Sequence, residues 1–194
     1  MSTEPIRNRI LRAAAEEFAR HGFEGARVAR IAAAAEANKE RLYHYYGNKE
    51  DLFTAVLDEA MRQLAAAEPF AADDLGGYVA RMVDFHREHP TLVQLLLAEA
   101  RHHGSAPLPH ESDRAAHYRR RVEAIRQAQR RGAVRTDVDP ETLLYAVLAL
   151  VATASALPQL TRLILGADPV EVAGHGELRA GLRRLLDVLT TPRP

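Results

Sequence analysis

Residues 26–53 read ARVARIAAAAEANKERLYHYYGNKEDLF and contain two short helical patterns separated by a tight turn. In the first pattern, Ile31 and Ala35 recur at the spacing of one helix face. Asn38 follows the turn and can cap the second pattern, because its side chain can accept hydrogen bonds from first-turn amides. A short helix, a turn and a capped second helix form the layout of a helix-turn-helix DNA reader.

The second of these helices presents basic and aromatic side chains. Leu42 and Tyr46 lie four residues apart and are expected to face the core. This leaves the side chains of Lys39, Glu40, Tyr43 and His44 outward. Lys and Arg neutralise phosphates and can donate to guanine, and Tyr hydroxyls commonly reach phosphate oxygens. Lys49 begins the next helix, whose amide terminus can also meet the DNA backbone. The predicted DNA-binding residues are Arg27, Val28, Asn38, Lys39, Glu40, Arg41, Tyr43, His44, Tyr45 and Lys49.

Each of these residues also has an ordinary explanation that involves no DNA. An exposed charged side chain on a helix is most often only solvated, and the tyrosines can pack against their neighbours. DNA binding is favoured by the combination of a compact three-helix unit, a capped third helix and a polar face of aromatic and basic residues.

The stretch from Phe18 to Phe53 resembles the tetracycline-repressor (TetR) family of bacterial transcriptional regulators. That family has a first helix ending F-x-x-x-G-[FY], an I-A pair in the second helix, and the run L-Y-x-[YH]-[FY]-x-x-K-E-x-L. The same elements here are Phe18 with Gly22-Phe23, Ile31-Ala32, and the run from Leu42 to Leu52, without a gap. The resemblance implies a dimer that binds an operator through this segment and a small-molecule effector through its remaining helices.

The segment departs from the family pattern at the start of the second helix, at the turn and in the third helix. The family usually has a capping Thr at the position of Ala26, which cannot cap, so Arg27 is expected to contact the DNA backbone instead. Glu36 occupies a position that is usually Gly, and a left-handed conformation there would cost on the order of 1 kcal/mol. Glu40 and Arg41 replace smaller residues, so the base preference is expected to be this protein's own.

The rest of the chain is predicted to be helical as well. Apolar residues recur at helical spacing through most of the 194 residues, and no segment alternates as a strand does. Asn48, Asp139-Pro140 and Asp168-Pro169 are helix start signals, the last with Glu171 three residues after the cap. We therefore predict an all-α protein of nine or ten helices.

The chain is expected to divide into a helix-turn-helix domain over residues 1–48 and a larger effector-binding and dimerisation domain over residues 49–194. The run from Leu143 to Leu157 is apolar nearly all round and must be buried on more than one side. The last helix is a natural partner for it, with one leucine stripe formed by Leu178, Leu182, Leu185, Leu186 and Leu189. These two helices can be core within one chain. Paired with a second copy, they would form an isologous four-helix interface, and we expect a homodimer through these last two helices.

The amino-acid composition limits the classes of protein to which the chain can belong. Its 47% hydrophobic and 27% charged residues are those of an ordinary soluble protein, and Lys plus Arg equal Asp plus Glu at 26 each. The absence of Cys excludes disulfides, Cys-based zinc sites and thiol nucleophiles. No signal peptide is visible, and the longest uncharged apolar run is shorter than the roughly 20 residues that span a bilayer. We therefore expect a cytoplasmic, nucleoid-associated protein without membrane contact.

The effector is expected to bind among the helices of the larger domain. Residues of these types are more often core or surface than ligand contacts, and the candidates are Tyr78, Met82, Phe85, His86, Leu96, Glu99, His103 and Tyr118. Six histidines between residues 86 and 117 also suggest a metal, and Glu99 with His102 has the Glu-x-x-His spacing of di-iron bundles. That chemistry needs a second copy of the motif, which the sequence lacks, so we expect no metal and no cofactor.

Three functions compete at this stage. The leading hypothesis is a dimeric repressor that a small-molecule effector releases from a palindromic operator. An enzyme is disfavoured because the sequence has no phosphate-cradling Gly-rich loop, no G-x-S-x-G turn and no H-E-x-x-H pair. The alternative is a helical interaction or metal-binding bundle without DNA binding, in which Lys39→Ala or Tyr43→Phe would leave function unchanged.

Overall fold

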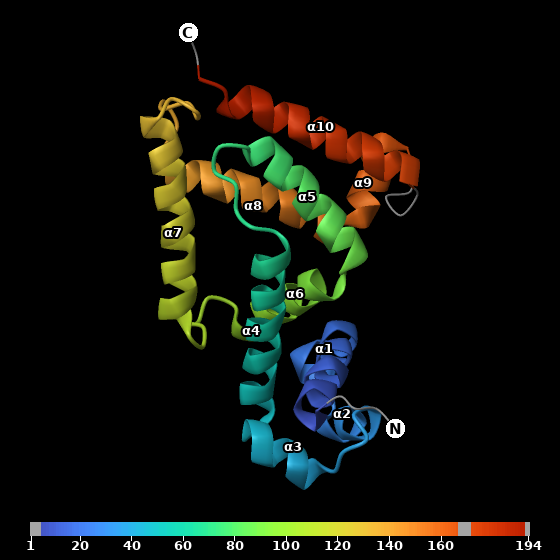
Figure 1. Cartoon of the computed structure of the whole chain (residues 1–194). Helices are drawn as coiled ribbons and strands as arrows, with labels where there is room; N and C mark the ends of the chain where they lie inside the picture. Colours follow the sequence, from blue (N-terminus) through green and yellow to red (C-terminus); the bar gives the residue numbers. More distant parts are fainter. Residues whose placement is uncertain (1–4, 167–171, 193–194) are drawn as a thin grey trace. The chain divides into compact units, whose positions relative to one another are not determined.

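The computed structural model describes residues 5–166 and 172–192, which contain helices and no strand. The predicted all-α class is confirmed, and so is the expectation of nine or ten helices. The expected start signal at Asp168-Pro169 lies outside the described residues. The helices are α1 (Ile6–Gly25), α2 (Val28–Ala34), α3 (Lys39–Tyr46), α4 (Lys49–Ala67), α5 (Leu75–Glu88), α6 (Thr91–His103), α7 (Glu111–Arg130), α8 (Pro140–Ala156), α9 (Pro158–Leu165) and α10 (Val172–Thr190) (Figure 1).

The contacts between helices divide the chain into two compact units. Unit 1 comprises Met1–Ala67 and Pro90–Pro109, and therefore α1–α4 and α6, whereas unit 2 comprises Glu68–His89 and His110–Pro194. Helix α6 belongs to unit 1 because it packs against α1 and α4. The expected domain boundary at residue 48 stays a prediction, since it separates α1–α3 from α4, with which they share a compact unit.

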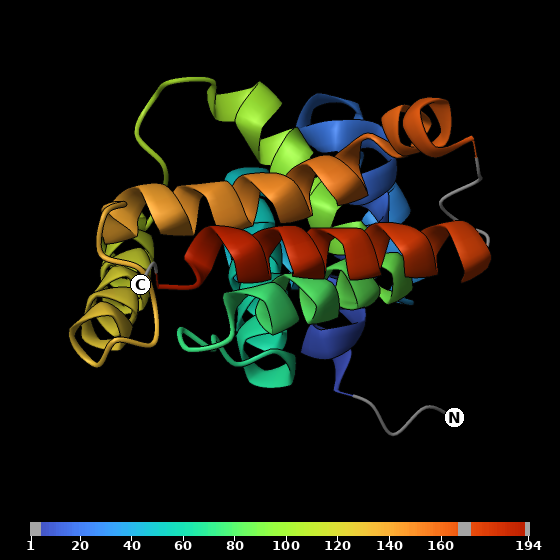
Figure 2. The same ribbon diagram turned by 90° about the horizontal axis from the view of Figure 1, so that it is seen from above.

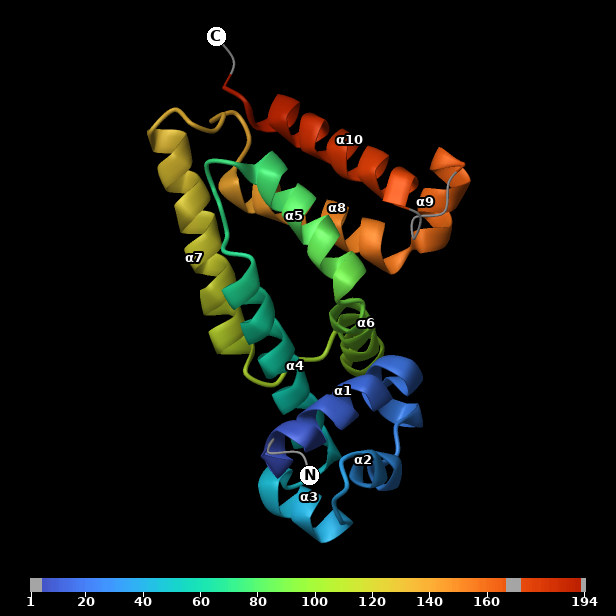
Figure 3. The ribbon, with the colours of Figure 1, turned by 45° about the vertical axis from the view of Figure 1, so that its right-hand side comes forward.

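Helices α1 and α4 pack against each other (Figure 3), and aromatic rings from both close the core of unit 1. Phe18 is fully buried, and its ring centroid lies 4.8 Å from that of Phe53. The ring centroid of Phe23, near the end of α1, lies 5.4 Å from that of Phe53. Ile31 of α2 and Leu42 of α3 are also fully buried and belong to this core. The apolar faces of the three N-terminal helices are thus packed inward, and their polar faces are left for solvent or a partner.

Unit 2 is built around α5, which packs against α10 along its length and against α8 (Figure 2). Gly76 permits the close approach of α10, because a Cβ there would lie 2.9 Å from the backbone oxygen of Arg183. Across the same contact, Arg179 Nε donates to Asp84 Oδ2 at 2.6 Å. Arg135 Nη1 donates to the backbone oxygen of Leu189 at 3.2 Å and so helps to cap the end of α10.

The leucine stripe of α10 is only partly buried within the chain. Leu186 is buried, whereas Leu185 and Leu189 are each 44% exposed. At 100° per residue the five leucines lie within an arc of about 100°, so they form one stripe of which the edge at Leu186 is buried. Within the chain, the buried face packs mainly on α5 and not on α8. The outward face of α10 remains exposed.

Helix α8 is buried on more than one side, as expected, because it packs against both α5 and α7. Leu143, Leu144, Val147 and Val151 are buried, but Tyr145 is 77% exposed. Asp139 caps α8 as predicted, since its Oδ1 accepts from the Thr142 amide at 2.8 Å. Among the described residues no single helix is long and apolar enough to cross a membrane; α8 and α9 together reach that length and composition, but they are bent by 88° at the break between them.

Candidate nucleic-acid interface

The turn between α2 and α3 contains a residue in the left-handed conformation. Glu36 adopts a left-handed backbone with φ of 51°, and the amide of Ala37 donates to the carbonyl of Ala32 at 2.9 Å. Asn38 then caps α3, because its Oδ1 accepts from the amide of Arg41 at 2.8 Å. The turn therefore fixes where α3 starts, at a cost on the order of 1 kcal/mol for a non-glycine residue at Glu36.

Helix α3 is held to the core by two residues one turn apart. Leu42 is fully buried and Tyr46 is 6% exposed. The Tyr46 hydroxyl donates to the backbone oxygen of Arg7 at 3.2 Å, which links α3 to α1. Burial raises the pKa of Tyr46, so its hydroxyl remains a donor at neutral pH. This anchor orients the rest of α3 outward.

The outward face of α3 carries the predicted contact residues. At about 100° per residue, Glu40 and His44 lie opposite the buried pair. Lys39 and Tyr43 flank them on one side, and Arg41 and Tyr45 flank them on the other. All six are exposed, with Tyr43 at 43% and Tyr45 at 41%. The structure thus brings six of the predicted residues together on one exposed surface, which we call the α3 face.

The start of α2 is capped by a residue that the sequence reasoning missed. Ala26 is buried, and the amide of Arg27 donates to Glu17 Oε1 at 2.9 Å. The same carboxylate accepts from Arg30 Nε at 2.8 Å. Burial opposes ionisation of Glu17, but these hydrogen bonds outweigh it and hold its pKa below the usual value. Glu17 of α1 therefore takes the place of a capping Thr, while the Arg27 side chain remains exposed.

Two further predicted residues, Val28 and Lys49, lie on α2 and α4. Val28 is half-buried and packs against the unit 1 core. Asn48 caps α4 by accepting from the Asp51 amide at 2.9 Å, which places Lys49 in the first turn of that helix. Lys49 Nζ lies 4.6 Å from the centroid of the Phe23 ring. Lys39 and Lys49 are the only lysines in the sequence, and they mark the first residues of α3 and α4.

The Asn38 cap can be tested by substitution. Asn38→Ala is expected to lower the free energy of unfolding by about 1 kcal/mol, because the Arg41 amide loses its acceptor. Chemical denaturation of the purified protein measures this loss. Asn38→Ser should restore most of the stability, since Ser also caps, and equal stability of the Ala variant and the wild type would contradict the assigned cap.

The effector candidates fall into both compact units. Leu96, Glu99 and His103 belong to unit 1, where Leu96 packs against the core and His103 Nε2 lies 3.5 Å from Glu50. The other five belong to unit 2, where Tyr78, Met82 and His86 are buried and Phe85 and Tyr118 are half-buried. Five of the eight candidates therefore belong to unit 2: Tyr78, Met82, Phe85, His86 and Tyr118.

Three buried polar atoms in unit 2 lack a hydrogen-bond partner among the described residues: Tyr78 Oη, His86 Nδ1 and Arg121 Nε. The Arg121 guanidinium is buried, lying 5.3 Å from the Phe70 ring centroid and 5.9 Å from that of Tyr78. Burial raises the pKa of the Tyr78 hydroxyl, and the Arg121 charge opposes that shift. A buried polar group without a hydrogen-bond partner lowers the stability of the folded protein, so the presence of three such groups in unit 2 requires an explanation.

His86 gives the protein a predictable response to acid. Burial, with a smaller contribution from His89, lowers the pKa of His86 from 6.5 to about 4. The unfolded chain therefore binds a proton before the folded one does. The free energy of unfolding is expected to fall by about 3 kcal/mol as the pH drops from about 6.5 to about 4, and to be fully retained above this window.

Denaturation of wild type and variants across this pH range measures the effect. His86→Leu should remove this part of the pH dependence, whereas His44→Ala, at an exposed position on α3, should leave it in place. The same pH dependence in wild type and His86→Leu would contradict the assignment.

Comparisons with known proteins match both parts of the chain. The family model for bacterial regulatory proteins of the tetR family matches residues 10–56. The model for the tetracyclin repressor-like C-terminal domain matches residues 74–183. Over 185 residues the chain is 41% identical to the HTH-type transcriptional repressor SCO4008 of Streptomyces coelicolor, covering 95% of this chain and 96% of that protein.

Solved structures agree with these matches. The crystal structure of SCO4942 from Streptomyces coelicolor aligns with a TM-score of 0.84 and 30% identity, covering 98% of this chain and 100% of that one. The crystal structure of AibR in complex with isovaleryl coenzyme A and operator DNA has a TM-score of 0.70 and covers 97% of this chain and 100% of that one. At 21% identity, the AibR likeness shows the fold alone. With two family models and a repressor aligned over nearly the whole chain, the protein belongs to the tetR family of DNA-binding transcriptional regulators.

Proposed function

We propose that this protein is a homodimeric repressor that binds a palindromic operator through the α3 face and is released from it by a small-molecule effector bound in unit 2. The observation that carries the proposal is the exposed, polar and aromatic α3 face on a capped helix whose other side is buried. The 41% identity to an HTH-type transcriptional repressor supports repression as the outcome. We place its action at the chromosome, in the cytoplasm.

The geometry of α3 suggests which of its side chains contact bases and which contact phosphates. When α3 lies in the major groove, Glu40 and His44 are directed toward base edges, because they lie opposite the buried pair Leu42 and Tyr46. A carboxylate at position 40 can accept from the N4 amine of cytosine. Lys39 and Tyr43 on one flank can contact phosphates, and Arg41 and Tyr45 can do so on the other. We therefore expect Glu40 to set base preference and the flanks to set affinity.

Exposed apolar residues in unit 2 support the dimer. Tyr145 of α8, Leu163 and Ile164 of α9, and Val188 of α10 are each at least 70% exposed. Large exposed apolar patches commonly mark protein–protein interfaces. Helices α8 and α10 are the two for which the sequence predicts dimerisation, and an isologous interface between them would pair two α3 faces for two half-sites about one turn of DNA apart.

The effector is assigned to unit 2 because of its unpaired buried polar groups. Tyr78 and Arg121 are buried beside the aromatic ring of Phe70 and each has an unsatisfied polar atom. His86 of α5 is also buried and offers a third. Ligand sites typically combine apolar walls with a few polar groups of this kind. AibR, which shares the fold, was solved with isovaleryl coenzyme A and operator DNA. By reciprocal coupling, an effector that weakens operator binding must itself bind more weakly to the operator complex.

A binding selection tests the proposal. Purified full-length protein is mixed with genomic fragments, including the DNA that adjoins its own coding sequence, and the bound fragments are measured by gel shift at several salt concentrations. We expect a sequence-specific complex that weakens as salt rises, because phosphate contacts release counterions. If no fragment binds more tightly than bulk DNA does, the proposed function is wrong.

A further inference from the structure

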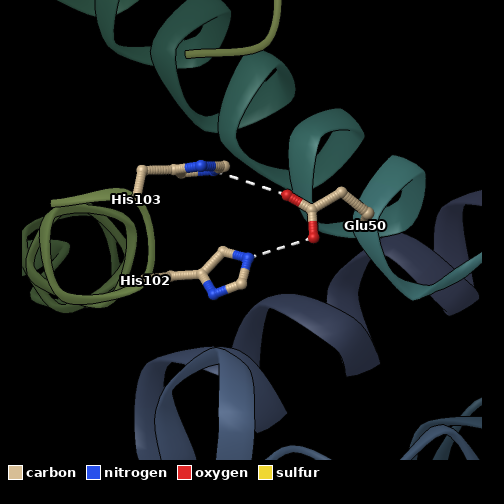
Figure 4. A group of neighbouring side chains, drawn as sticks. All are labelled: Glu50, His102 and His103. Carbon is tan, nitrogen blue, oxygen red and sulfur yellow. Dashed lines mark hydrogen bonds and ion pairs between the residues drawn. The ribbon is translucent and has the colours of Figure 1, made fainter. Parts of the chain in front are cut away.

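A cluster of ionisable side chains in unit 1 plays no part in the proposed DNA contacts. Glu50 lies in the first turn of α4, and His102 and His103 end α6 (Figure 4). His102 Nε2 lies 3.0 Å from Glu50 Oε2, and His103 Nε2 lies 3.5 Å from Glu50 Oε1. One donor atom from each residue lies within 4.8 Å of the other two. The three side chains thus point toward one another from two helices.

The spacing suits a small divalent cation. Around a tetrahedral zinc ion with bonds of about 2.0–2.1 Å, neighbouring ligand atoms lie about 3.4 Å apart. The two distances involve different oxygens of Glu50, and with one donor atom from each residue the three lie within 4.8 Å of one another. Side-chain rotations that shorten the longer separations bring the three donors onto one ion. Two imidazoles and one carboxylate form a nitrogen and oxygen set that zinc accepts, with the fourth position left for water.

His102 is oriented from its other side. Its Nδ1 lies 3.2 Å from Glu24 Oε1, at the end of α1. A ligating histidine commonly donates its second N–H to a carboxylate, which fixes the ring and makes its metal-binding nitrogen more basic. The ring also stacks on Phe23, with centroids 3.7 Å apart. The position and tautomer that metal binding requires are therefore supported by two neighbours.

The contacts of His102 fit a bound cation. A neutral imidazole has only one N–H, yet carboxylate oxygens face both of its nitrogens, at 3.2 and 3.0 Å. In the neutral ring, one of these contacts sets a lone pair against a carboxylate. An imidazolium avoids that mismatch by donating from both nitrogens. A cation bound at Nε2 avoids it as well, because Nδ1–H then donates to Glu24 while Nε2 and Glu50 share the ion.

The site is accessible as well as preorganised. The side chain of Glu50 is 39% exposed, and those of His102 and His103 are 19% and 13% exposed. An ion can therefore enter from solvent without unfolding unit 1.

We propose that Glu50, His102 and His103 form a divalent-cation site, best matched to zinc, in which Glu24 is a positioning residue for His102. A bound ion joins the C-terminal end of α6 to the first turn of α4. That turn follows α3 after Gly47 and Asn48 only, so the ion braces the helix that begins directly after the DNA-reading one.

Metal titration of the full-length protein tests this site. The protein is treated with a chelator, dialysed, and titrated with Zn²⁺ by calorimetry and with Co²⁺ by visible absorption. We expect one ion per chain and a Co²⁺ spectrum typical of nitrogen and oxygen ligands. Glu50→Gln and His103→Ala should lose this binding, whereas Glu24→Gln should weaken it about 10–100-fold. Thermal melting without metal shows that each variant is folded.

The control is His117→Ala, which removes a half-buried histidine of α7 in unit 2. It should bind Zn²⁺ as the wild type does. The proposal is overturned if the wild type takes up no stoichiometric ion, because the cluster is then held by hydrogen bonds alone. It is equally overturned if Glu50→Gln and His103→Ala bind Zn²⁺ with unchanged affinity, because the ion then lies elsewhere.

Discussion

Replacing Lys39 by Ala and Tyr43 by Phe in the same chain is expected to weaken operator binding by about four orders of magnitude or more. Both side chains are exposed on one flank of the α3 face, and a hydrogen bond to a charged phosphate contributes about 1.5–3 kcal/mol. In a dimer each loss occurs twice. Because each Lys39 neutralises one phosphate, the slope of log affinity against log salt should fall by about 2. Fluorescence anisotropy at several salt concentrations measures both quantities.

A matched control is Arg119→Ala, which removes an exposed cation from α7 in unit 2. It should leave operator affinity and the salt slope unchanged. If the double variant binds the operator as the wild type does, α3 is not the DNA-reading helix, and the alternative of a helical bundle without DNA binding gains support.

Phe18→Ala is expected to lower the free energy of unfolding of unit 1 by about 3–5 kcal/mol, the range for a large aromatic lost from a packed core. Phe18 is fully buried, and its ring contacts the rings of Phe53 and Phe23. This core holds α1 against α4, so operator binding should be lost with it. Urea denaturation monitored by circular dichroism measures the change in stability.

Phe18→Leu provides the comparison, because it keeps most of the apolar volume and should cost much less than the Ala variant. A loss below about 1 kcal/mol for Phe18→Ala would mean that the site can collapse around the cavity, and the aromatic core described here would not be what holds unit 1 together.

Features set by neighbouring residues were predictable from the sequence. The caps at Asn38, Asn48 and Asp139 depend on residues only three positions away, and the structure confirms all three. The family pattern usually has Gly at the position of Glu36, and Glu36 has the left-handed φ of 51° whose cost is on the order of 1 kcal/mol. The inward positions of α3, Leu42 and Tyr46, follow from helical spacing alone.

Features that depend on packing between distant segments were not predictable in this way. Glu17 caps α2 from the preceding helix, which no pattern within α2 indicates. The leucines of α10 have the spacing of a buried helix, but only contact with α5 decides which of them are buried. Glu50 and His102 are 52 residues apart and meet only because α6 packs against α4. The Glu-x-x-His spacing in the sequence pairs Glu99 with His102. The carboxylate that contacts His102 in the structure is instead that of Glu50, which comes from a distant segment.

The most direct measurement of the central claim uses the two lysines of the chain. Acetylation of surface amines, read by mass spectrometry, reports Lys39 and Lys49 separately, and no other lysine competes. If α3 lies in the operator's major groove, saturating operator should strongly slow acetylation of Lys39, and high salt or effector should restore it. Unchanged acetylation of Lys39 in the saturated complex would contradict the assignment of α3 as the DNA-reading helix.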